Sequence, residues 1–285
     1  MATSSGGGNS GQPWPGTSAW TTPSPSKCSW PKRCRCTGAF GRSSSNSTAS
    51  SAHLSRTLLA GTSGISCSGR SLTESTLQEV ARDIGKAGGR AETAVVDALN
   101  EEQVDAFVDG VARKSESIDV SFNVISYGDI QQPLMEIDVD DFTFPITVAT
   151  RTHFLTTRAA ATHMIKQGSG VVLMFGGSGP QTLPGLGGFK VALDAMEGLR
   201  RQWAIELGPH GVRVVTMVTS GIIETIPRQA EGRAEIEEGI KKASLLNRTT
   251  TLEDVGSTAW FIASDKAAAI TNATVNISSG AIPDY

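Results

Sequence analysis

The chain has 285 residues, of which 39% are hydrophobic and 19% charged, and its formal net charge is −3. This length and composition are typical of one large α/β domain with room for a sizeable hydrophobic core. The longest apolar run, Val171 to Phe175, is far shorter than the roughly 20 residues of a membrane-spanning helix, so we expect no transmembrane segment.

The charge is unevenly distributed along the chain. No acidic residue precedes Glu74, so the first part carries +7 and the remainder −10. The basic residues are dispersed among Ser, Gly and Pro, which does not favour nucleic-acid binding. The four cysteines are Cys28, Cys34, Cys36 and Cys67. Their spacing, with no nearby His, predicts neither a zinc site nor a disulfide framework.

Residues 1–50 differ in composition from the rest of the chain. They are rich in Ser, Gly, Thr and Pro without a hydrophobic period, which predicts a disordered or aberrant N-terminal segment. Because the sequence has neither a disulfide framework nor an apolar secretory stretch, we expect a cytoplasmic protein. The alternative is an organelle-targeted N-terminus, because this segment is Ser-rich, basic and free of acidic residues.

From residue 51 onward, strand patterns alternate with helix patterns. We predict helices at 52–61, 72–89, 100–115, 141–167, within 184–207 and at 251–264, and strands at 64–70, 90–98, 118–126, 170–177, 212–221 and 273–280. This alternation predicts a single α/β domain over 51–285, with a doubly wound parallel sheet covered on both faces. Ligands of such sheets bind at the carboxyl ends of the strands.

Three stretches carry a resemblance to a known family. They are "GRSLTESTLQEVARDIGKAGGRAETAVVDALNEEQVDAFV", "ELGPHGVRVVTMV" and "LEDVGSTAWFIASDKAAAITNATVNISSG". Together they resemble the short-chain dehydrogenase/reductase family, in which Pro-Glu-Asp-Val and Asp-Gly-Gly are usual in the last stretch. The resemblance covers residues from about 52 to 285. It implies a Rossmann-like fold, a nicotinamide cofactor, and hydride transfer to or from a small-molecule carbonyl or alcohol.

The family's first strand and glycine-rich phosphate loop should fall in "KRCRCTGAFGRSSSNST". Thr37, Gly38 and Gly41 match the loop motif in part, but "KRCRC" does not have the pattern of a buried strand. We therefore expect the first strand and glycine-rich loop to be degraded or missing. An added transit peptide, an out-of-frame product and real divergence remain alternatives for this region.

The resemblance also implies a set of cofactor contacts, namely Arg70, Asp97, Ala98, Asn123 and Ser220. A basic residue at Arg70 pairs with the 2′-phosphate in the family, which favours NADP over NAD, although a solvated loop arginine is the alternative. Asp97 matches the residue that contacts adenine. Asn123 matches the first residue of the family's Asn-Asn-Ala-Gly.

The family catalyses hydride transfer with an Asn, Ser, Tyr and Lys set, in which lysine lowers the tyrosine pKa. Here the four positions hold Ala149, Gly176, Phe189 and Leu193. This register follows from "LPGLGGF" upstream and from Glu206 downstream, with no gap between them. A competing register takes Lys190 as the lysine, which places Leu186 at the tyrosine and requires a three-residue insertion. Both registers lose the tyrosine.

Few other side chains are candidates to replace the catalytic set. Tyr127 would be a surrogate acid, and Ser178 is close to the lost serine, whereas His153 and His163 have the pattern of ordinary helix residues. An apolar stripe recurs at helical spacing through Leu193, Met196, Leu199 or Arg200, Trp203 and Leu207. In the family this helix pairs with its symmetry mate, so we expect an exposed Trp203 to be buried in a homodimer or homotetramer.

Three functional hypotheses follow. The first is an NADP(H)-dependent oxidoreductase of this family, with NAD as the alternative cofactor. The second is a non-catalytic protein of the same fold that binds a ligand or oligomerises, because all four catalytic positions are substituted. The third is a defective product without the first strand of its sheet. None of them requires a metal, a nucleic acid or a membrane.

Overall fold

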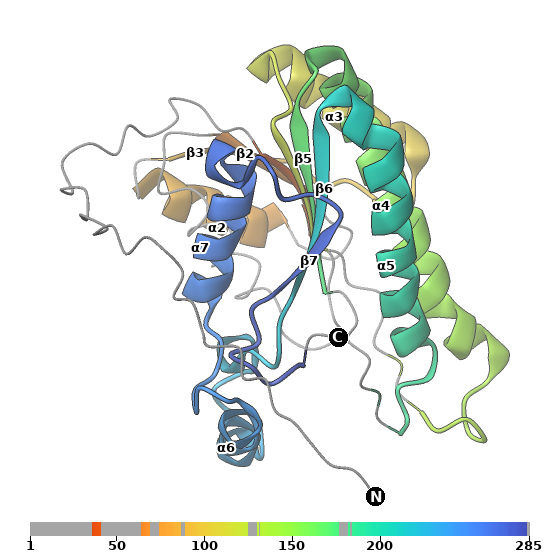
Figure 1. Ribbon diagram of the computed structural model, residues 1–285, viewed down its shortest axis with the longest axis vertical. Helices are drawn as coiled ribbons and strands as arrows, with labels where there is room; N and C mark the ends of the chain where they lie inside the picture. Colours follow the sequence, from red (N-terminus) through yellow and green to blue (C-terminus); the bar gives the residue numbers. More distant parts are fainter. Residues whose placement is uncertain are drawn as a thin grey trace, which may run out of the picture. The chain divides into compact units, whose positions relative to one another are not determined.

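The computed structural model describes residues 36–40, 64–68, 74–86, 89–124, 130, 132–176, 182 and 184–283. All of them belong to Pro31–Tyr285, the second of the two units into which the chain divides. They form a seven-stranded parallel sheet in the order β3-β2-β1-β4-β5-β6-β7 (Figure 1). The strands are β1 (Cys36–Phe40), β2 (Gly64–Ser68), β3 (Arg90–Thr93), β4 (Val120–Val124), β5 (Gly170–Phe175), β6 (Val212–Val218) and β7 (Ala273–Asn276). The order reverses between β1 and β4, so the predicted doubly wound, Rossmann-like fold is confirmed.

β1 lies in the middle of the sheet, in the region where a degraded or missing first strand was expected. It pairs in parallel with β2 on one side and with β4 on the other. The strand is therefore present, although its sequence is less apolar than that of a typical buried strand. Thr37 and Gly38, assigned above to the phosphate loop, lie inside the strand, and Gly41 lies outside the described residues. Because β1 precedes residue 51, the sheet begins before the predicted start of the domain.

Helices cover both faces of the sheet. They are α2 (Glu74–Lys86), α3 (Glu101–Ser115), α4 (Val139–Gln167), α5 (Gly187–Leu207), α6 (Arg233–Ala243) and α7 (Leu252–Ala263). Figure 1 shows α2 and α7 on one face of the sheet and α3, α4 and α5 on the other. The three-layer arrangement follows from parallel strands joined by helical crossovers.

Each face of the sheet packs into its own hydrophobic cluster, as β5 illustrates. Val171 and Leu173 belong to the cluster under α2 and α7, whereas Val172 and Met174 belong to the cluster under α3, α4 and α5. All four side chains are at most 5% exposed. This arrangement explains why the strand is a continuous apolar run rather than an alternating one.

The ends of α4 follow from local capping. The Asp138 side chain accepts a hydrogen bond from the Asp141 backbone N–H at 2.8 Å, and Gly168 ends the helix with a φ of 71°. The helix therefore begins two residues before its predicted start at Asp141, and Pro145 lies in its second turn without ending it. A left-handed residue at a helix end is most easily a glycine.

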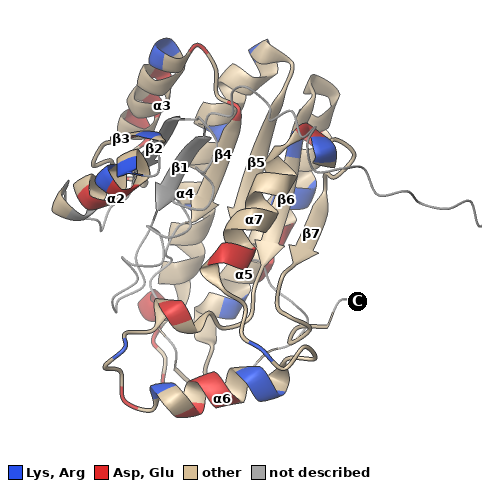
Figure 2. Ribbon diagram, turned by 90° about the vertical axis from the view of Figure 1, so that its left-hand side faces the viewer, with Lys and Arg blue, Asp and Glu red and all other residues tan. Residues whose placement is uncertain are grey.

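The sequence did not predict α6, which lies in the connection between β6 and α7. It contains six charged residues among eleven, and none of its residues is buried. A helix that is polar on nearly all sides has no apolar stripe to reveal its period. Figure 2 shows α6 beyond the carboxyl ends of β6 and β7, at the edge where ligands are expected.

Candidate functional site

Asn123 lies near the carboxyl end of β4, where it pairs with Ala39 of β1 and Met174 of β5. Its side chain is fully buried, and neither Oδ1 nor Nδ2 has a hydrogen-bond partner in the part of the chain that the structure describes. A buried polar group without a partner costs about 1–3 kcal/mol. Asn123 lies at the point where the strand order reverses, which makes its amide a candidate contact for a bound group.

Asp97 and Ala98 form the turn between β3 and α3. The Asp97 carboxylate accepts a hydrogen bond from the Leu99 N–H at 3.0 Å, and the Asp97 N–H donates to the Gln103 side chain at 3.0 Å. Ala98 is buried and Asp97 is half-buried. The turn is therefore rigidly built, and it holds a carboxylate at the same edge of the sheet as Asn123 because all strands are parallel.

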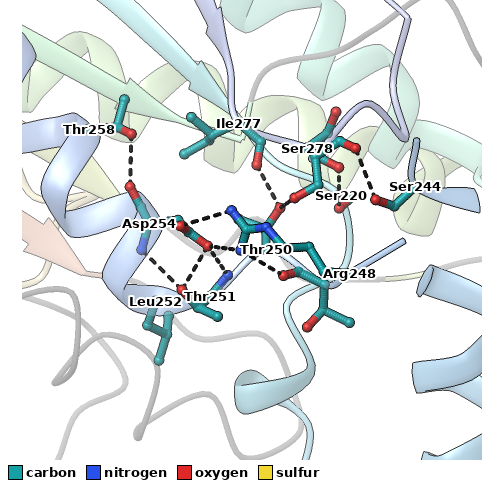
Figure 3. Close-up of polar contacts among 12 residues, drawn as sticks. Ser220, Ser244, Arg248, Thr250, Thr251, Leu252, Asp254, Thr258, Ile277 and Ser278 are labelled. Carbon is teal, nitrogen blue, oxygen red and sulfur yellow. Dashed lines mark hydrogen bonds and ion pairs between the residues drawn. The ribbon is translucent and has the colours of Figure 1, made fainter. Parts of the chain in front are cut away.

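Ser220, which follows β6, has its hydroxyl bound by the segment that follows β7. The hydroxyls of Ser220, Ser244 and Thr250 donate to the successive carbonyls of Ile277–Ser279 at 2.7 to 3.2 Å (Figure 3). These three bonds fasten both ends of the connection between β6 and α7 to the C-terminal segment. The Ser220 hydroxyl hydrogen is therefore used within the protein, and its oxygen can still accept a hydrogen bond.

The start of α7 is held by two carboxylates. Thr251 and Asp254 form a capping box, and Arg248 binds both oxygens of Asp254 at 2.7 and 3.1 Å (Figure 3). Hydrogen bonds from Arg248 hold the pKa of the Asp254 carboxyl well below its usual range. Glu224 accepts the Leu252 N–H at 2.7 Å. The family usually has proline at the position of Leu252, and proline has no backbone N–H that needs a hydrogen-bond acceptor.

Three of the residues considered for the site lie outside the described residues. They are Arg70, Tyr127 and Ser178. The 2′-phosphate partner, the surrogate acid and the turn serine therefore stay predictions.

The four positions that the resemblance assigns to the catalytic set hold no acid or base. Phe189 and Leu193 lie one turn apart on α5 and pack against the cluster between the sheet and α3, α4 and α5. Ala149 is fully buried in the same cluster. Gly176 follows β5 with a φ of 94°, a conformation that favours glycine and would strain a serine. The site as built has no side chain at these positions that can exchange a proton.

Lys190, the lysine of the competing register, is engaged along its own helix. Its Nζ lies 2.7 Å from Asp194 Oδ1, and its side chain is 18% exposed. With 3.6 residues per turn, Lys190 points about 100° away from Phe189 and about 60° away from Leu193 around the helix. It therefore does not occupy the position one turn after Phe189, where the gapless register places the lysine.

A buried ion pair on α5 was not predicted. Arg200 donates to Glu197 at 3.0 Å and to Asn272 at 2.7 Å, and Thr274 of β7 donates to Glu197 at 2.8 Å. Both charged side chains are at most 10% exposed. Glu197 lies one turn after Leu193, so this face of α5 ends in polar contacts that join the helix to β7. The only sequence signal was a charge at Arg200, a position compatible with the apolar stripe.

Trp203 contradicts the expectation of an exposed aromatic side chain on α5. It is 8% exposed and belongs to the cluster between α5 and the sheet. The stripe that carries it packs within the domain, so burying Trp203 does not require a partner subunit.

The two histidines of α4 differ in environment. His163 lies 2.7 Å from Asp109 on the surface. His153 is fully buried, and its Nδ1 donates to the Ala149 carbonyl at 3.0 Å. Burial lowers the pKa of His153 to about 4, and the bond to Ala149 opposes this shift only in part.

We expect the free energy of unfolding to fall as the pH drops from 6.5 to about 4. In this window the unfolded chain binds a proton at His153 and the folded chain does not, because the folded pKa is the lower one. Once His153 is fully protonated in the unfolded state, the free energy of unfolding is lower by roughly 3 kcal/mol. Urea unfolding at pH 7.5 and 4.5 should show a smaller loss for His153→Gln than for the wild type. Equal losses in both proteins would contradict the buried, neutral histidine.

Neither a metal centre nor a membrane span is found among the residues described. No three or more His, Cys, Asp or Glu side chains there are grouped to hold a metal ion. No helix in these ranges combines the length and the apolar character that crossing a bilayer requires.

The strand order, the covered faces and the ligand edge define a protein of the Rossmann-like class. A family model described as "Enoyl-(Acyl carrier protein) reductase" matches residues 62–281. The chain belongs to the short-chain dehydrogenase/reductase family of oxidoreductases, as its sequence motifs implied.

Several relatives and solved structures are similar to the chain. The enoyl-[acyl-carrier-protein] reductase [NADH] FabI of Synechocystis is 28% identical, over 65% of this chain and 72% of that protein. The (+)-cis,trans-nepetalactol synthase NEPS2 of Nepeta racemosa is 28% identical over 71% and 78%. Carbonyl reductase [NADPH] 2 of Sus scrofa is 24% identical over 53% and 63%. A short-chain dehydrogenase/reductase structure from Mycobacterium ulcerans shares the fold, with a TM-score of 0.76 at 21% identity over 87% and 89%.

Proposed function

We propose that the chain binds a nicotinamide cofactor at the carboxyl edge of its sheet, with NADP(H) preferred and NAD(H) as the alternative. The observation that carries this proposal is the buried Asn123 amide, whose donor and acceptor have no partner among the described residues. A ligand group at the edge between β1 and β4 would satisfy both atoms and repay the free energy of burying them.

Different residues at this edge of the sheet would contact different parts of the cofactor. Asp97 and Ala98 would take the adenine end, and the backbone at Ser220 would lie beside the nicotinamide half. Arg70 would bind the 2′-phosphate and carries the preference for NADP(H). The names of the relatives mention both NADH and NADPH, so they support a nicotinamide cofactor without choosing its phosphate. When bound, the nicotinamide would exchange a hydride with a carbonyl or alcohol.

A second candidate function is cofactor binding without efficient turnover. The observation that favours it is the character of α5, where Phe189 and Leu193 are apolar and pack into the core cluster. Removing a positioned proton donor lowers a rate by about 10²–10⁴-fold. On this reading the protein acts as a binding or oligomerisation subunit of the family's fold.

The cofactor proposal is tested by titrating the full chain with NADPH and NADH and following nicotinamide fluorescence. Asn123→Leu keeps the side-chain volume and removes the amide, so it should weaken binding at least about tenfold, the loss expected for one or two hydrogen bonds. The same variant should unfold at a higher denaturant concentration without cofactor, because it no longer buries an unsatisfied amide.

Thr216→Val is the matched control. The Thr216 hydroxyl is also buried without a partner among the described residues. It lies in the same row as Asn123, but on β6, two strands away from β4 and from the point where the strand order reverses. This variant should gain stability and leave cofactor binding unchanged. Saturable binding with no turnover across carbonyl substrates would favour the second function. No binding by a chain that unfolds cooperatively would overturn the proposal.

We also propose that the protein is a homodimer or homotetramer. Large apolar side chains remain exposed on the outer surfaces of α4 and α5, namely Phe144, Phe154, Ile165, Val191 and Ile205. Burial of such side chains between subunits is a usual driving force for association. Light scattering on the eluted peak of a sizing column should give a multiple of 29.8 kDa, and a monomer at micromolar concentration would contradict it.

A further inference from the structure

α6 lies beyond the carboxyl ends of β6 and β7, at the edge of the sheet where the cofactor is proposed to bind (Figure 2). None of its residues is buried, so no hydrophobic core fixes its position. Its Ile240 side chain covers Gly221, where a Cβ would lie 2.7 Å from Ile240 Cδ1. A helix held by surface packing and by the bonds at its two ends is the kind of element that opens locally at a low free energy.

The start of α6 is fastened to the segment that follows β6. The Arg233 guanidinium donates to the carbonyls of Ile223 and Ile226, at 3.2 and 3.5 Å. That segment is itself fixed, because the Glu224 carboxylate accepts the first backbone N–H of α7 at 2.7 Å. The start of α6 therefore has a firm support about which the rest of the helix can turn.

The end of α6 is held by one residue of the C-terminal segment, Ser279. The Ser279 carbonyl accepts two hydrogen bonds, from the Ser244 hydroxyl at 2.9 Å and from the Leu246 N–H at 3.2 Å (Figure 3). The Ser279 hydroxyl lies 3.3 Å from the hydroxyl of Thr250. Ser279 therefore joins the residues that follow α6 to the segment that follows β7.

Ser279 has a backbone conformation that serine rarely adopts. Its φ is 56°, in the left-handed region, and the next residue, Gly280, has a φ of 84°. A side chain in that region is strained and persists only where surrounding contacts impose it. A Cβ at Gly280 would also lie 2.8 Å from Leu245 Cβ, so glycine lets the two segments approach closely. Breaking the contacts of Ser279 releases its strain, which makes opening easier.

We propose that α6 is a lid over the ligand edge, that it turns about its Arg233 end, and that Ser279 is the latch that holds its other end closed. With the contacts of Ser279 made, α6 lies across the way to the carboxyl ends of β6 and β7. When they break, the end of α6 moves away and this edge opens. The inference rests on the proposed function only for the molecule that passes the lid, because the latch consists of contacts within the protein.

Hydrogen exchange of the full chain without cofactor, followed by mass spectrometry, tests the latch. Ser244→Ala removes one of the two bonds to the Ser279 carbonyl, so amide exchange in α6 should accelerate by about 3–10-fold, the factor expected for one neutral hydrogen bond. Exchange in α7 should not change. Ser264→Ala is the matched control, because Ser264 is as buried as Ser244 and donates to the Phe261 carbonyl at the carboxyl end of α7. It should leave exchange in α6 unchanged.

Gly280→Ala keeps the test decisive if Ser244→Ala folds poorly. The new Cβ would displace Leu245, so exchange in α6 should again accelerate. The effects of Gly280→Ala and Ser244→Ala should not add, because both act through the same contact. Additive effects, equal acceleration in α6 and α7, or no acceleration in α6 would overturn the latch.

The rate of NADPH dissociation tests the lid separately. Ser244→Ala should speed dissociation of bound NADPH, followed by stopped-flow fluorescence, by the same factor of about 3–10, and Ser264→Ala should not. Faster exchange in α6 with an unchanged dissociation rate would overturn the role of α6 as a lid. If the folded chain binds no NADPH while Ser244→Ala still accelerates exchange in α6, the cofactor proposal fails and the latch is confirmed.

Discussion

Replacing Phe189 with tyrosine and Leu193 with lysine is expected to raise the rate of cofactor-dependent carbonyl reduction by about 10²–10⁴-fold. The two positions lie one turn apart on the same face of α5, which is the spacing the family uses for its proton donor and the lysine that lowers the donor's pKa. Gly176 is left unchanged in this variant because its φ of 94° disfavours a serine. The measurement is NADPH oxidation with a panel of carbonyl compounds, at equal cofactor saturation.

The matched control introduces the tyrosine at the competing register. Leu186→Tyr pairs the new phenol with Lys190, whose Nζ is already bound by Asp194 at 2.7 Å. This variant should gain no activity. Activity from Leu186→Tyr and none from the Phe189→Tyr/Leu193→Lys variant would show that the other register is the functional one. No activity from either, with cofactor bound, would contradict the assignment of this α5 face to hydride transfer.

Gly188→Ala is expected to destabilise the protein by about 2–3 kcal/mol, the range of overpacked cores. A Cβ at Gly188 would lie 1.8 Å from the Phe142 carbonyl oxygen and 3.1 Å from Pro145 Cγ. Because two of the crowded atoms belong to backbone, α4 and α5 would have to move apart at the start of α5. Urea unfolding followed by circular dichroism measures the change.

Gly198→Ala is the control on the same helix. A Cβ there meets no atom within 4 Å, so alanine should stabilise the helix by about 0.5–1 kcal/mol through its higher helix propensity. Similar changes in both variants would mean that the close approach of α4 and α5 does not constrain Gly188. A large loss for Gly188→Ala would instead show that this contact sets where Phe189 and Leu193 lie.

The elements with strong periodicity were predicted well. The apolar run at 170–177 gave β5, and the amphipathic pattern at 100–115 gave α3, which starts at its Asn100 cap. Local physics decides such segments, because hydrophobic period, capping and glycine stops all act within one turn or strand. By contrast, α6 was not predicted because it buries none of its residues.

The site was predictable in part. Motif spacing predicts that Asp97 and Asn123 follow or end strands β3 and β4, and the structure has both near the carboxyl ends of these strands. Two features of the site depend on residues far away in the chain. Asn123 is buried without a partner among the described residues, and Ser220 donates to Ser278. Motif spacing identifies which residue lies at an edge of the sheet. Only tertiary packing determines whether the polar atoms of that residue have hydrogen-bond partners within the protein.

By itself, the sequence determined the fold class and the family, because these depend on residue identity, period and spacing along the chain. The tertiary structure alone decided that a strand with the unpromising sequence Cys36–Phe40 lies in the middle of the sheet, where β2 and β4 supply its hydrogen bonds. It also decided that Trp203 is buried within the domain and that Glu197 and Arg200 form an ion pair between α5 and β7. These outcomes depend on contacts between segments many residues apart, which no local pattern encodes.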